Sequence, residues 1–541
     1  MQIKGAMLGS TDFRGLLDRL RAADQLCDVS VPTDIRYLST LIDQSDKAIL
    51  FHDVPGYSMP VVSGLLGSRE RLAIAFGCPY PEIHEKLQIG LENPLEPITV
   101  SWEETREMYQ EGASVDLYEL PVPLCSRLDG GPVITAGLTI AQDSEAGLNF
   151  GGYRYLIREP NLSGIDIVTP NNLRRMAETA FAAQRPLAIA ICIGTHPIEV
   201  IASTYRAPFG TNELTIAGGM RGEPIRLAPC RTIDLPCLAD AEIVLEAEIL
   251  PTGWTQPEGR FGEFTRLMGA LHWNPHVRVK AITIRKGETP IFYALHMPWE
   301  NIWPGAPIRE AALHRALRDA NIQVTAINVT PGASCFFHVA IAIRKQPGDG
   351  KNAILAALTA GDIKHVVIVD DDIDVFDPLE VEWAIATRVQ ADRDLVVVSG
   401  ARSKPLDPSI ASTPGRIPTT AKMGIDATIP DDVPRMRFDR ISYPFADEVR
   451  LADVLGDTPG LATDATEIEA AVLAPKIRAA LQSGPLYFAD IVEHFSNHNF
   501  KSVARALGSL HCVSEIWQDE DGRICLADSP LAARAPTNRA D

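Results

Sequence analysis

Apolar and polar residues follow different spacings in successive parts of the chain, and these spacings predict its domains. Residues 13–20 carry apolar side chains at helical intervals, and residues 48–52 form an apolar run typical of a short buried strand. Two prolines in Leu120-Pro121-Val122-Pro123 then interrupt the pattern. We therefore predict an N-terminal α/β domain over residues 1–118.

Short strand-like runs separated by glycine-containing loops dominate residues 119–304. The clearest runs are residues 133–135, 187–193, 242–250 and 277–284. We expect only one clear helix among them, over residues 172–183. Many short strands with few helices are typical of a β-barrel or a β-sandwich decorated with helices.

Helical and strand patterns alternate over residues 305–455. Residues 308–320 have helical spacing, while residues 365–369 and 395–398 have the composition of buried strands, with a helical pattern between them at 379–387. A helix between two buried strands is a βαβ pattern, which implies a parallel sheet. We predict an α/β domain here and expect it to take part in oligomerisation.

The last part of the chain, residues 464–530, has the pattern of an appended unit. Three helices are expected, at 467–482, 487–495 and 501–510, followed by a β-hairpin at 513–526 with an Asp-Gly turn. This order predicts a winged-helix-like unit. Five basic and ten acidic side chains lie within residues 464–528, which argues against DNA binding. Packing or oligomerisation is the favoured role, and a regulatory sensor is the alternative.

Composition and charge exclude several classes of protein. The chain has 541 residues and a formal net charge of −20, which disfavours binding to nucleic acid. Residues 1–17 contain no long apolar run, and no stretch reaches about 18 apolar residues, so we expect neither a signal peptide nor a membrane span. Nine scattered cysteines without a CxxC pair are typical of reduced core thiols. These features predict a cytoplasmic protein.

Three short motifs favour structural over metal-binding or phosphate-binding roles. Asp370–Asp374 lacks the glycine and the distal glutamate of an EF-hand loop, so its carboxylates are expected to cap a helix or bind backbone amides. His494 and His498 have helical spacing but no evident third ligand, which favours a solvated helix face. Gly218–Gly222 has no strand-to-helix context and is not expected to be a phosphate loop.

Two glutamates and one arginine form the most informative charged pattern. Glu258 and Glu263 are five positions apart, so on a regular strand they would face opposite sides. Gly259 and Gly262 permit a turn between them, which would let both carboxylates meet Arg154 from another glycine-rich segment. Such a trio can keep one carboxylate ionised and leave the other to carry a proton. Solvated surface contacts remain the alternative from spacing alone.

Eight short segments lie in a specific joint order between residues 10 and 450. They are Leu138–Ile140, Asn149–Arg154, Ala241–Glu246, Pro257–Gly259, Phe261–Glu263, Val369–Asp374, Trp383–Arg388 and Lys422–Thr428. In these segments the chain resembles the UbiD family of prenylated-FMN-dependent (de)carboxylases. The resemblance implies a multidomain α+β and α/β fold whose central domain, residues 119–304, is a split β-barrel that binds the flavin. It does not cover the appended unit.

The resemblance also implies an activity and roles for the charged trio. The family releases CO₂ reversibly and without oxidation from aromatic or α,β-unsaturated carboxylic acids, using an Arg-Glu-Glu or Arg-Glu-Asp set. Arg154, Glu258 and Glu263 occupy those positions. Arg154 is then expected to orient the substrate carboxylate and keep Glu258 ionised, and Glu263 to donate the proton that replaces CO₂. Hydroxybenzoates, heteroaromatic acids and polycyclic aromatic acids are the candidate substrates.

The same resemblance implies how the cofactor is held. Its phosphate is bound through a divalent metal, usually manganese, with potassium nearby, and Asn149, Asn172 and Glu213 occupy the metal-ligand positions. The family has a histidine where this chain has Asn172, and an amide oxygen can also ligate a hard cation. Lys422 occupies the position of the phosphate-binding lysine. The remaining cofactor contacts are expected from Thr135, Gly151, Gly152 and Tyr153, together with Arg154.

The chain departs from the family pattern at two arginines near the acids and at Asn172. Arg260 and Arg266 are additional arginines near the acids, which either bind a further acidic or oxygenated group of the substrate or point away towards surface acids. A flavin prenyltransferase as cofactor supplier and a homo-oligomer are the implied partners. Asn172 motivates an alternative function, in which the chain is a non-catalytic flavin- or metal-binding homologue or a subunit of a larger carboxylase complex.

Overall fold

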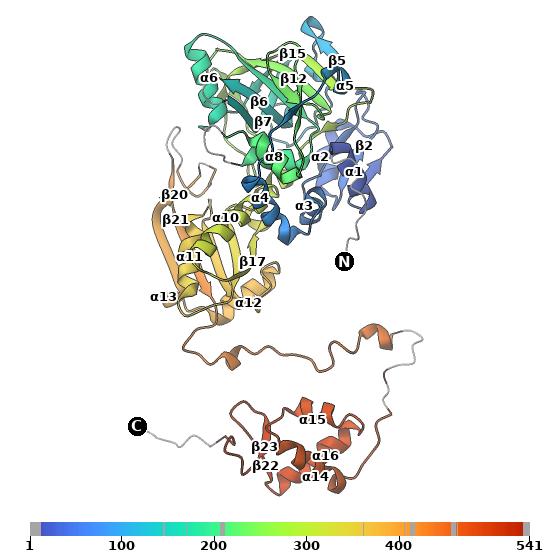
Figure 1. Cartoon of the computed structure of the whole chain (residues 1–541), viewed down its shortest axis with the longest axis vertical. Coiled ribbons are helices and arrows are strands. Elements are labelled where there is room, and N and C mark those ends of the chain that lie inside the picture. The colour runs from blue at the N-terminus through green and yellow to red at the C-terminus, as the bar shows by residue number, and fades with distance from the viewer. Residues whose placement is uncertain are drawn as a thin grey trace. The chain divides into compact units, whose positions relative to one another are not determined.

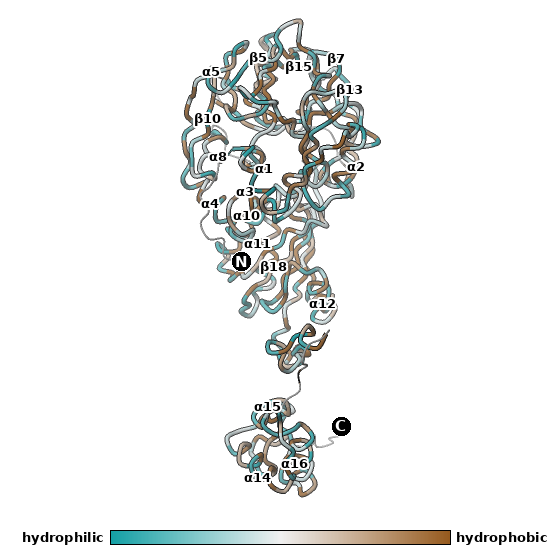
Figure 2. The backbone as a smooth tube through the Cα atoms, turned by 90° about the vertical axis from the view of Figure 1, so that its right-hand side faces the viewer, coloured by the Kyte–Doolittle hydropathy of each residue, from teal (hydrophilic) through white to brown (hydrophobic). Residues whose placement is uncertain are grey.

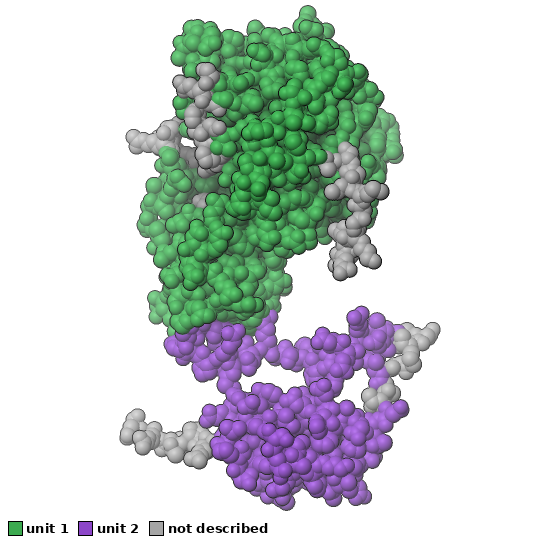
Figure 3. All heavy atoms as spheres, in the orientation of Figure 1, with its two compact units in different colours: residues 1–428 green, residues 429–541 purple. Residues whose placement is uncertain are grey.

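A computed structural model describes most of the chain. The described residues are 12–143, 147–168, 170–205, 211–360, 362–404, 406–411, 417–455, 461 and 464–533. The chain separates into two units, residues 1–428 and 429–541 (Figure 3). Each unit has an apolar core of its own.

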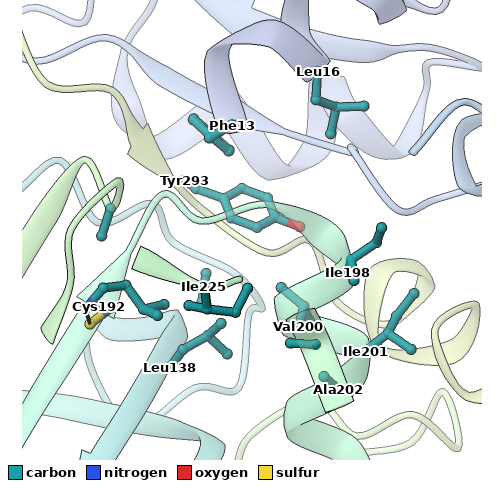
Figure 4. Close-up of a cluster of buried hydrophobic side chains, with 14 of the residues drawn as sticks. Phe13, Leu16, Leu138, Cys192, Ile198, Val200, Ile201, Ala202, Ile225 and Tyr293 are labelled. Carbon is teal, nitrogen blue, oxygen red and sulfur yellow. Dashed lines mark hydrogen bonds between the residues drawn. The ribbon is translucent and has the colours of Figure 1, made fainter. Parts of the chain in front are cut away.

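The N-terminal part of the first unit is a small α/β layer that is completed by a strand from much later in the chain. Its elements are α1 (Phe13–Ala22), β1 (Leu26–Val29), α2 (Leu38–Asp43), β2 (Ala48–Phe51), β3 (Val61–Ser63), α3 (Arg69–Phe76), α4 (Ile83–Glu92), β4 (Ile98–Thr99) and α5 (Trp102–Thr105). The sheet order β1-β2-β3-β16 includes β16 (Phe292–Tyr293). Figure 4 shows Phe13 of α1 against Tyr293 of β16, with ring centroids 5.9 Å apart. This contact ties the first helix to the chain that follows the barrel.

A closed antiparallel barrel of six strands forms the centre of the first unit (Figure 1). Its strands are β6 (Val133–Asp143), β7 (Gly147–Glu159), β8 (Leu162–Ile165), β9 (Leu187–Ile193), β12 (Ile243–Ile249) and β15 (His276–Arg285), and β5 (Arg106–Glu111) extends it. Pairing of β12 with β15 closes the ring. Alternating burial drives closure, because Ile189 and Ile191 pack in one apolar cluster while Ala190 and Cys192 pack in another. The predicted barrel is confirmed.

Helices around the barrel correct one expectation. Helix α6 (Asn172–Ala182) matches the predicted one, but α7 (Pro197–Thr204) and α8 (Glu213–Arg221) also occur, so the expectation of a single helix is wrong. Residues 197–202 are all buried, so α7 has no polar face and lacks an amphipathic signature. The glycine-rich run at 218–222 is the end of α8, where Gly222 takes the left-handed capping conformation. Two short strands, β10 (Arg226–Pro229) and β11 (Pro236–Leu238), pair beside β4.

A five-stranded sheet with helices on both faces forms the rest of the first unit. Its order is β17-β18-β19-β21-β20, from strands Val324–Val329, His338–Ile343, His365–Asp370, Thr419–Ala427 and Leu395–Arg402 respectively. The helices are α9 (Trp299–Ile302), α10 (Gly305–Asp319), α11 (Asp349–Thr359), α12 (Pro378–Arg388) and α13 (Ala391–Asp394). Helices α10 and α11 cover one face and α12 the other.

The predicted parallel pairing around the 379–387 helix is wrong. Strands β18, β19 and β21 are parallel, but β20 lies beyond β21 and runs antiparallel to it at the edge of the sheet. Leu395 and Val397 of β20 are 39% and 65% exposed. An apolar run does not by itself distinguish a central strand from an edge strand, which explains the error.

The acidic run at the end of β19, Asp370–Asp374, has a structural role. Arg388 is fully buried, and its guanidinium donates to Asp370 Oδ2 at 2.9 Å and to Asp372 Oδ2 at 2.6 Å. Asp374 accepts from the backbone N–H of Phe376. These contacts agree with the predicted structural role of the run.

The described residues of the second unit include three α-helices and a hairpin. They are α14 (Ala470–Leu481), α15 (Phe488–His494), α16 (Phe500–Cys512), β22 (Ile516–Gln518) and β23 (Ile524–Leu526), and β22 and β23 are antiparallel. Helix α15 ends at His494, so the expectation that His494 and His498 share one helix is wrong. The winged-helix assignment stays a prediction.

No helix among the described residues combines the length and apolar character that crossing a membrane requires. Hydropathy changes over short distances along the backbone of Figure 2.

Candidate active site

The predicted charged trio comes together at one end of the barrel. Arg154 lies in β7, and Glu258 ends β13 (Gln256–Glu258), which pairs with β14 (His272–Asn274). Arg154 Nε lies 3.3 Å from Glu258 Oε1, and Arg154 Nη1 lies 3.2 Å from Glu263 Oε1. A single guanidinium therefore contacts both glutamates, which is one of the two arrangements that the spacing allowed.

Gly259, which lies between the two glutamates in the sequence, packs closely against the backbone of Gly130 in another loop. A Cβ on Gly259 would lie 2.6 Å from the Cα of Gly130, whereas a Cβ on Gly262 would meet only Met297 Cβ at 3.9 Å. Neither Gly259 nor Gly262 has a positive φ. The sequence argument expected both glycines to permit a turn, but the structure requires only Gly259, and it does so for close backbone approach.

Gly259→Ala is expected to destabilise the chain by about 1–3 kcal/mol, because the new methyl group overlaps backbone that cannot rotate away. Gly262→Ala is the matched control in the same loop and is expected to be tolerated. Thermal unfolding of the two variants measures the difference. Equal unfolding temperatures would show that the Gly130–Gly259 contact does not constrain the loop.

The two glutamates share a buried environment but differ in access. Burial raises the pKa of Glu258 and of Glu263, while the charge of Arg154 opposes the rise in both. Glu258 is 2% exposed, and its Oε2 accepts from Asn274 Nδ2 at 2.8 Å. Glu263 lies on the wall of the adjoining cavity. Of the two glutamates, Glu263 is therefore the one with access to a ligand.

Two further residues belong to this cluster and were missed from the sequence. Asp166 forms an ion pair with Arg154 Nη2, and His272 Nδ1 lies 3.1 Å from Asp166 Oδ2. Burial raises the pKa of Asp166, but the hydrogen bond from His272 and the charge of Arg154 outweigh it, so that the net pKa is lowered. The one available signal was a single acid inside the apolar run Ile165-Asp166-Ile167.

A cavity of about 560 Å³ adjoins the cluster, within the size range of ligand sites. Strands β6 and β7, helices α7 and α10 and the loop around Glu263 surround it. Its apolar lining is Leu138, Val200, Phe261, Phe264, Leu295, Met297, Ile308 and Phe336. Of the predicted cofactor contacts, Thr135, Gly152, Tyr153 and Arg154 line the cavity. Gly151 is not in the lining, and a Cβ there would lie 2.8 Å from the Tyr153 ring.

The wall contributed by the α/β sheet domain carries cations. Arg309, Arg402 and Lys404 line it, and Lys404 Nζ lies 2.9 Å from Asp362 Oδ2. Lys422 is not in the lining, and its Nζ donates to the carbonyl of Leu358 at 2.7 Å. Its phosphate contact stays a prediction. The three lining cations were missed because they lie outside the motifs.

The two additional arginines near the acids point away from the cavity. Arg260 is exposed and donates to the carbonyl oxygens of Gly269 and Met268, at 3.1 and 3.4 Å. The guanidinium of Arg266 lies 5.5 Å from the centroid of the Trp299 ring. Neither is among the described residues that line the cavity. The alternative in which they point outwards therefore holds, although their partners are carbonyls and a ring instead of surface acids.

Two of the three predicted metal ligands lie near each other. Glu213 Oε2 accepts from the N–H of Phe150, the neighbour of Asn149, at 3.1 Å. Asn149 is buried, and its Nδ2 has no hydrogen-bond partner in the described structure. Asn172 begins α6, and no hydrogen bond between described residues joins it to the other two. Described histidine, cysteine, aspartate and glutamate side chains form no group of three that could hold a metal, but the predicted set includes two asparagines.

Three family models match the first unit. The N-terminal, Rift-related and C-terminal domains of 3-octaprenyl-4-hydroxybenzoate carboxy-lyase match residues 17–88, 99–298 and 302–427. The appended unit lies outside all three, as the motifs predicted.

Characterised relatives share most of their length with this chain. Anhydromevalonate phosphate decarboxylase of Methanothermobacter thermautotrophicus is 34% identical over 423 residues, which are 77% of this chain and 97% of that protein. Gallate decarboxylase of Lactiplantibacillus plantarum is 29% identical over 440 residues, which are 74% of this chain and 87% of that protein.

Solved structures agree with the family models. The UbiD-class enzyme HmfF from Pelotomaculum thermopropionicum, in complex with FMN, has a TM-score of 0.76 and 39% identity, covering 82% of this chain and all of that one. An evolved dimeric form of HmfF in complex with prFMN has a TM-score of 0.73 and 36% identity over the same shares of the two chains. The match of fold and sequence over the whole first unit leads to one conclusion: the chain belongs to the UbiD family of carboxy-lyases.

Proposed function

We propose that the chain decarboxylates an aromatic or α,β-unsaturated carboxylic acid, reversibly and without oxidation, using prenylated FMN. The observation that carries the proposal is the Arg154–Glu263 pair on the wall of a cavity of about 560 Å³ that has both apolar and charged walls. A cation that can hold a carboxylate and an acid that can deliver a proton face the same space. The flavins in the two HmfF structures support the choice of cofactor.

The residues around the cavity fit such a cofactor. Gly152 opens the barrel wall where a Cβ would lie 3.3 Å from Ser203 Oγ, and apolar side chains line the floor beside it. Asn149 and Glu213, which lie outside the described cavity lining, would supply the hard oxygen donors that a divalent cation such as Mn²⁺ prefers, with Asn172 as the proposed third ligand and K⁺ nearby. When bound, prenylated FMN supplies the electron sink that loss of CO₂ from an sp² carbon requires.

The chain's own residues perform the remaining steps. Arg154 orients the substrate carboxylate, and the rings and aliphatic groups of Phe261, Leu295 and Met297 exclude water from it. As the carbon–carbon bond breaks, CO₂ leaves and the electron pair stays with the substrate. Glu263 then donates its proton to that carbon and becomes a carboxylate, which Arg154 stabilises. Glu258 accepts a hydrogen bond from Asn274 and remains ionised beside Arg154. Its negative charge offsets part of the positive charge of Arg154.

A second candidate function is a non-catalytic homologue or a subunit of a larger carboxylase complex. The observation that favours it is Asn172, which replaces the family's histidine and has no hydrogen bond to Asn149 or Glu213 among the described residues.

We also propose a homo-oligomer in which the α/β sheet domain or the C-terminal unit provides contacts. One of the solved relatives is an evolved dimeric form.

Production of the chain together with a flavin prenyltransferase tests the function. The mass and absorbance of the bound cofactor are recorded, and CO₂ release is measured with aromatic acids that carry or lack a second anionic group. We expect prenylated FMN to be bound and at least one acid to be decarboxylated. The cationic wall favours acids with the second anionic group. Bound cofactor without release or exchange of CO₂ on any acid would support the non-catalytic alternative instead.

A further inference from the structure

Arg154 faces three carboxylates through three different nitrogen atoms. Nε faces Glu258, Nη1 faces Glu263 and Nη2 faces Asp166. The side chains of Arg154 and Asp166 are 15% and 12% exposed, so the cluster is shielded from solvent. The proposed reaction uses the two glutamates and leaves Asp166 without a function.

His272 is built into the same two-stranded ribbon as Glu258. In the β13–β14 pairing, Glu258 lies directly opposite His272, and Asn274 two positions later binds the Glu258 carboxylate. The His272 ring reaches Asp166 Oδ2 at 3.1 Å and is 27% exposed. The ribbon therefore binds the Glu258 carboxylate directly through Asn274. It also acts on Arg154 through the contact between His272 and Asp166.

The charges in this cluster balance only when His272 is protonated. Arg154 and a protonated His272 carry two positive charges, which ionised Asp166 and Glu258 cancel while Glu263 holds its proton. If His272 is neutral, the same arrangement already has an excess negative charge before Glu263 ionises. Because like charges disfavour ionisation, a neutral His272 makes it harder for Glu263 to release its proton.

We propose that Asp166 and His272 are positioning residues: Asp166 holds the Arg154 guanidinium between the two glutamates, and protonated His272 sets the pH at which Glu263 gives up its proton. The consequence for turnover rests on the proposed function, whereas the electrostatic coupling between His272 and Glu263 does not.

The surrounding charges favour the protonated form of His272. The hydrogen bond to Asp166 raises the pKa of His272, with Glu263 adding to the rise, while partial burial and the charge of Arg154 oppose it. Burial raises the pKa of Glu263, the charge of Asp166 raises it further, and those of Arg154 and His272 lower it. Asp129, whose pKa burial raises to about 6 and the charge of Arg154 lowers, is a further titratable group near Arg154.

NMR titration of the full-length chain labelled at its 12 histidines tests the coupling without any substrate. Loss of a signal in His272→Gln assigns the resonance. Asp166→Asn is expected to lower the pKa of His272 by about one unit or more, since it removes the adjacent charge. Glu263→Gln is expected to lower the pKa of His272 by about half a unit. By thermodynamic linkage, protonation of His272 lowers the pKa of Glu263 by the same amount.

His52 provides the internal control, because it lies 2.8 Å from Asp28 in a separate ion pair. Its NMR signals are expected to stay at their wild-type positions in both variants. An unchanged pKa of His272 in Glu263→Gln would overturn the proposed coupling, whether or not the chain is an active decarboxylase. Thermal unfolding checks that each variant is folded, and the partly exposed His272 is the site that tolerates substitution best.

A pH profile with an identified substrate tests the consequence for turnover. Activity is lost as pH rises through the pKa of Glu263, because the donor must be protonated. In His272→Gln that pKa rises, so the alkaline limb is expected to move upward by about half to one pH unit, while His52→Gln leaves it in place. An unmoved limb would overturn the role of His272 in setting this pH. A folded, flavin-loaded wild type without turnover would instead contradict the proposed function and leave the NMR result standing.

Discussion

Glu263→Gln is expected to lower the rate of CO₂ release by a factor of about 10² to 10⁴, the usual contribution of a general acid. Glutamine preserves the size of the side chain, and its amide oxygen can still accept from Arg154 Nη1. It has no acidic proton to donate to the carbon that loses CO₂. The variant should therefore fold and bind flavin like the wild type while losing turnover, which absorbance of the cofactor and single-turnover kinetics measure together.

A glutamate of the same barrel serves as the matched control. Glu248 lies in β12 and pairs with Lys280 at 3.1 Å, away from the cavity lining. Glu248→Gln is expected to retain the wild-type rate. Wild-type turnover in Glu263→Gln would remove this residue from the mechanism. A loss of flavin in that variant would show that the glutamate supports binding and not only proton transfer.

Arg154→Met is expected to destabilise the first unit by about 3–5 kcal/mol at alkaline pH, because it leaves three buried carboxylates without their cation. The pKa values of Glu258 and Glu263 are raised by burial even with Arg154 present, and they rise further without it. A carboxyl group with a raised pKa takes up a proton as pH falls, and protonation removes the repulsion. The loss of stability should therefore shrink in acid and grow with pH.

Arg154→Lys separates charge from geometry. Lysine keeps one positive charge but cannot meet three carboxylates through three nitrogens of a planar fork. We expect it to recover part of the stability and little of the activity. Thermal unfolding at acid and alkaline pH, compared with turnover at the same pH values, measures both effects.

Arg158 in the same strand is the control for Arg154. It is partly exposed, and its guanidinium donates to the carbonyl of Pro257 at 3.0 Å. Arg158→Met is expected to change stability by about 0.5 kcal/mol or less. A pH-independent loss in Arg154→Met, or equal losses in the two variants, would show that the ion cluster does not determine stability here.

Local patterns predicted most elements whose burial alternates or whose polar face is continuous. The strand at 187–193 has the predicted bounds, and the 172–183 helix ends within one residue of them. Helix α7 was missed because its first residues are buried on all sides, and β20 was assigned to a parallel pair because its composition resembles that of a central strand. Periodicity reports which side of an element meets water, and it carries no information when both sides are covered or when the neighbouring strand is unknown.

The site divides in a similar way. The ordered motifs located Arg154, Glu258 and Glu263, which the structure brings into contact. Nothing in the local sequence joins Asp166 to His272, since the two are 106 positions apart and meet only because the end of β8 and the start of β14 lie near the same guanidinium. The sequence argument assigned Gly259 to a turn, but the position requires glycine because its backbone packs against the backbone of Gly130.

By itself, the amino-acid sequence determined the family, the barrel, the appended unit and the residue types of the charged trio, because these depend on motif order and on patterns within short segments. Only the tertiary structure decided which glutamate faces the cavity, which cations line its opposite wall and which carboxylate is the third partner of Arg154. Those features depend on the packing of segments that are distant in the chain, and the energy of a charged contact depends on burial and distance, which no local pattern records.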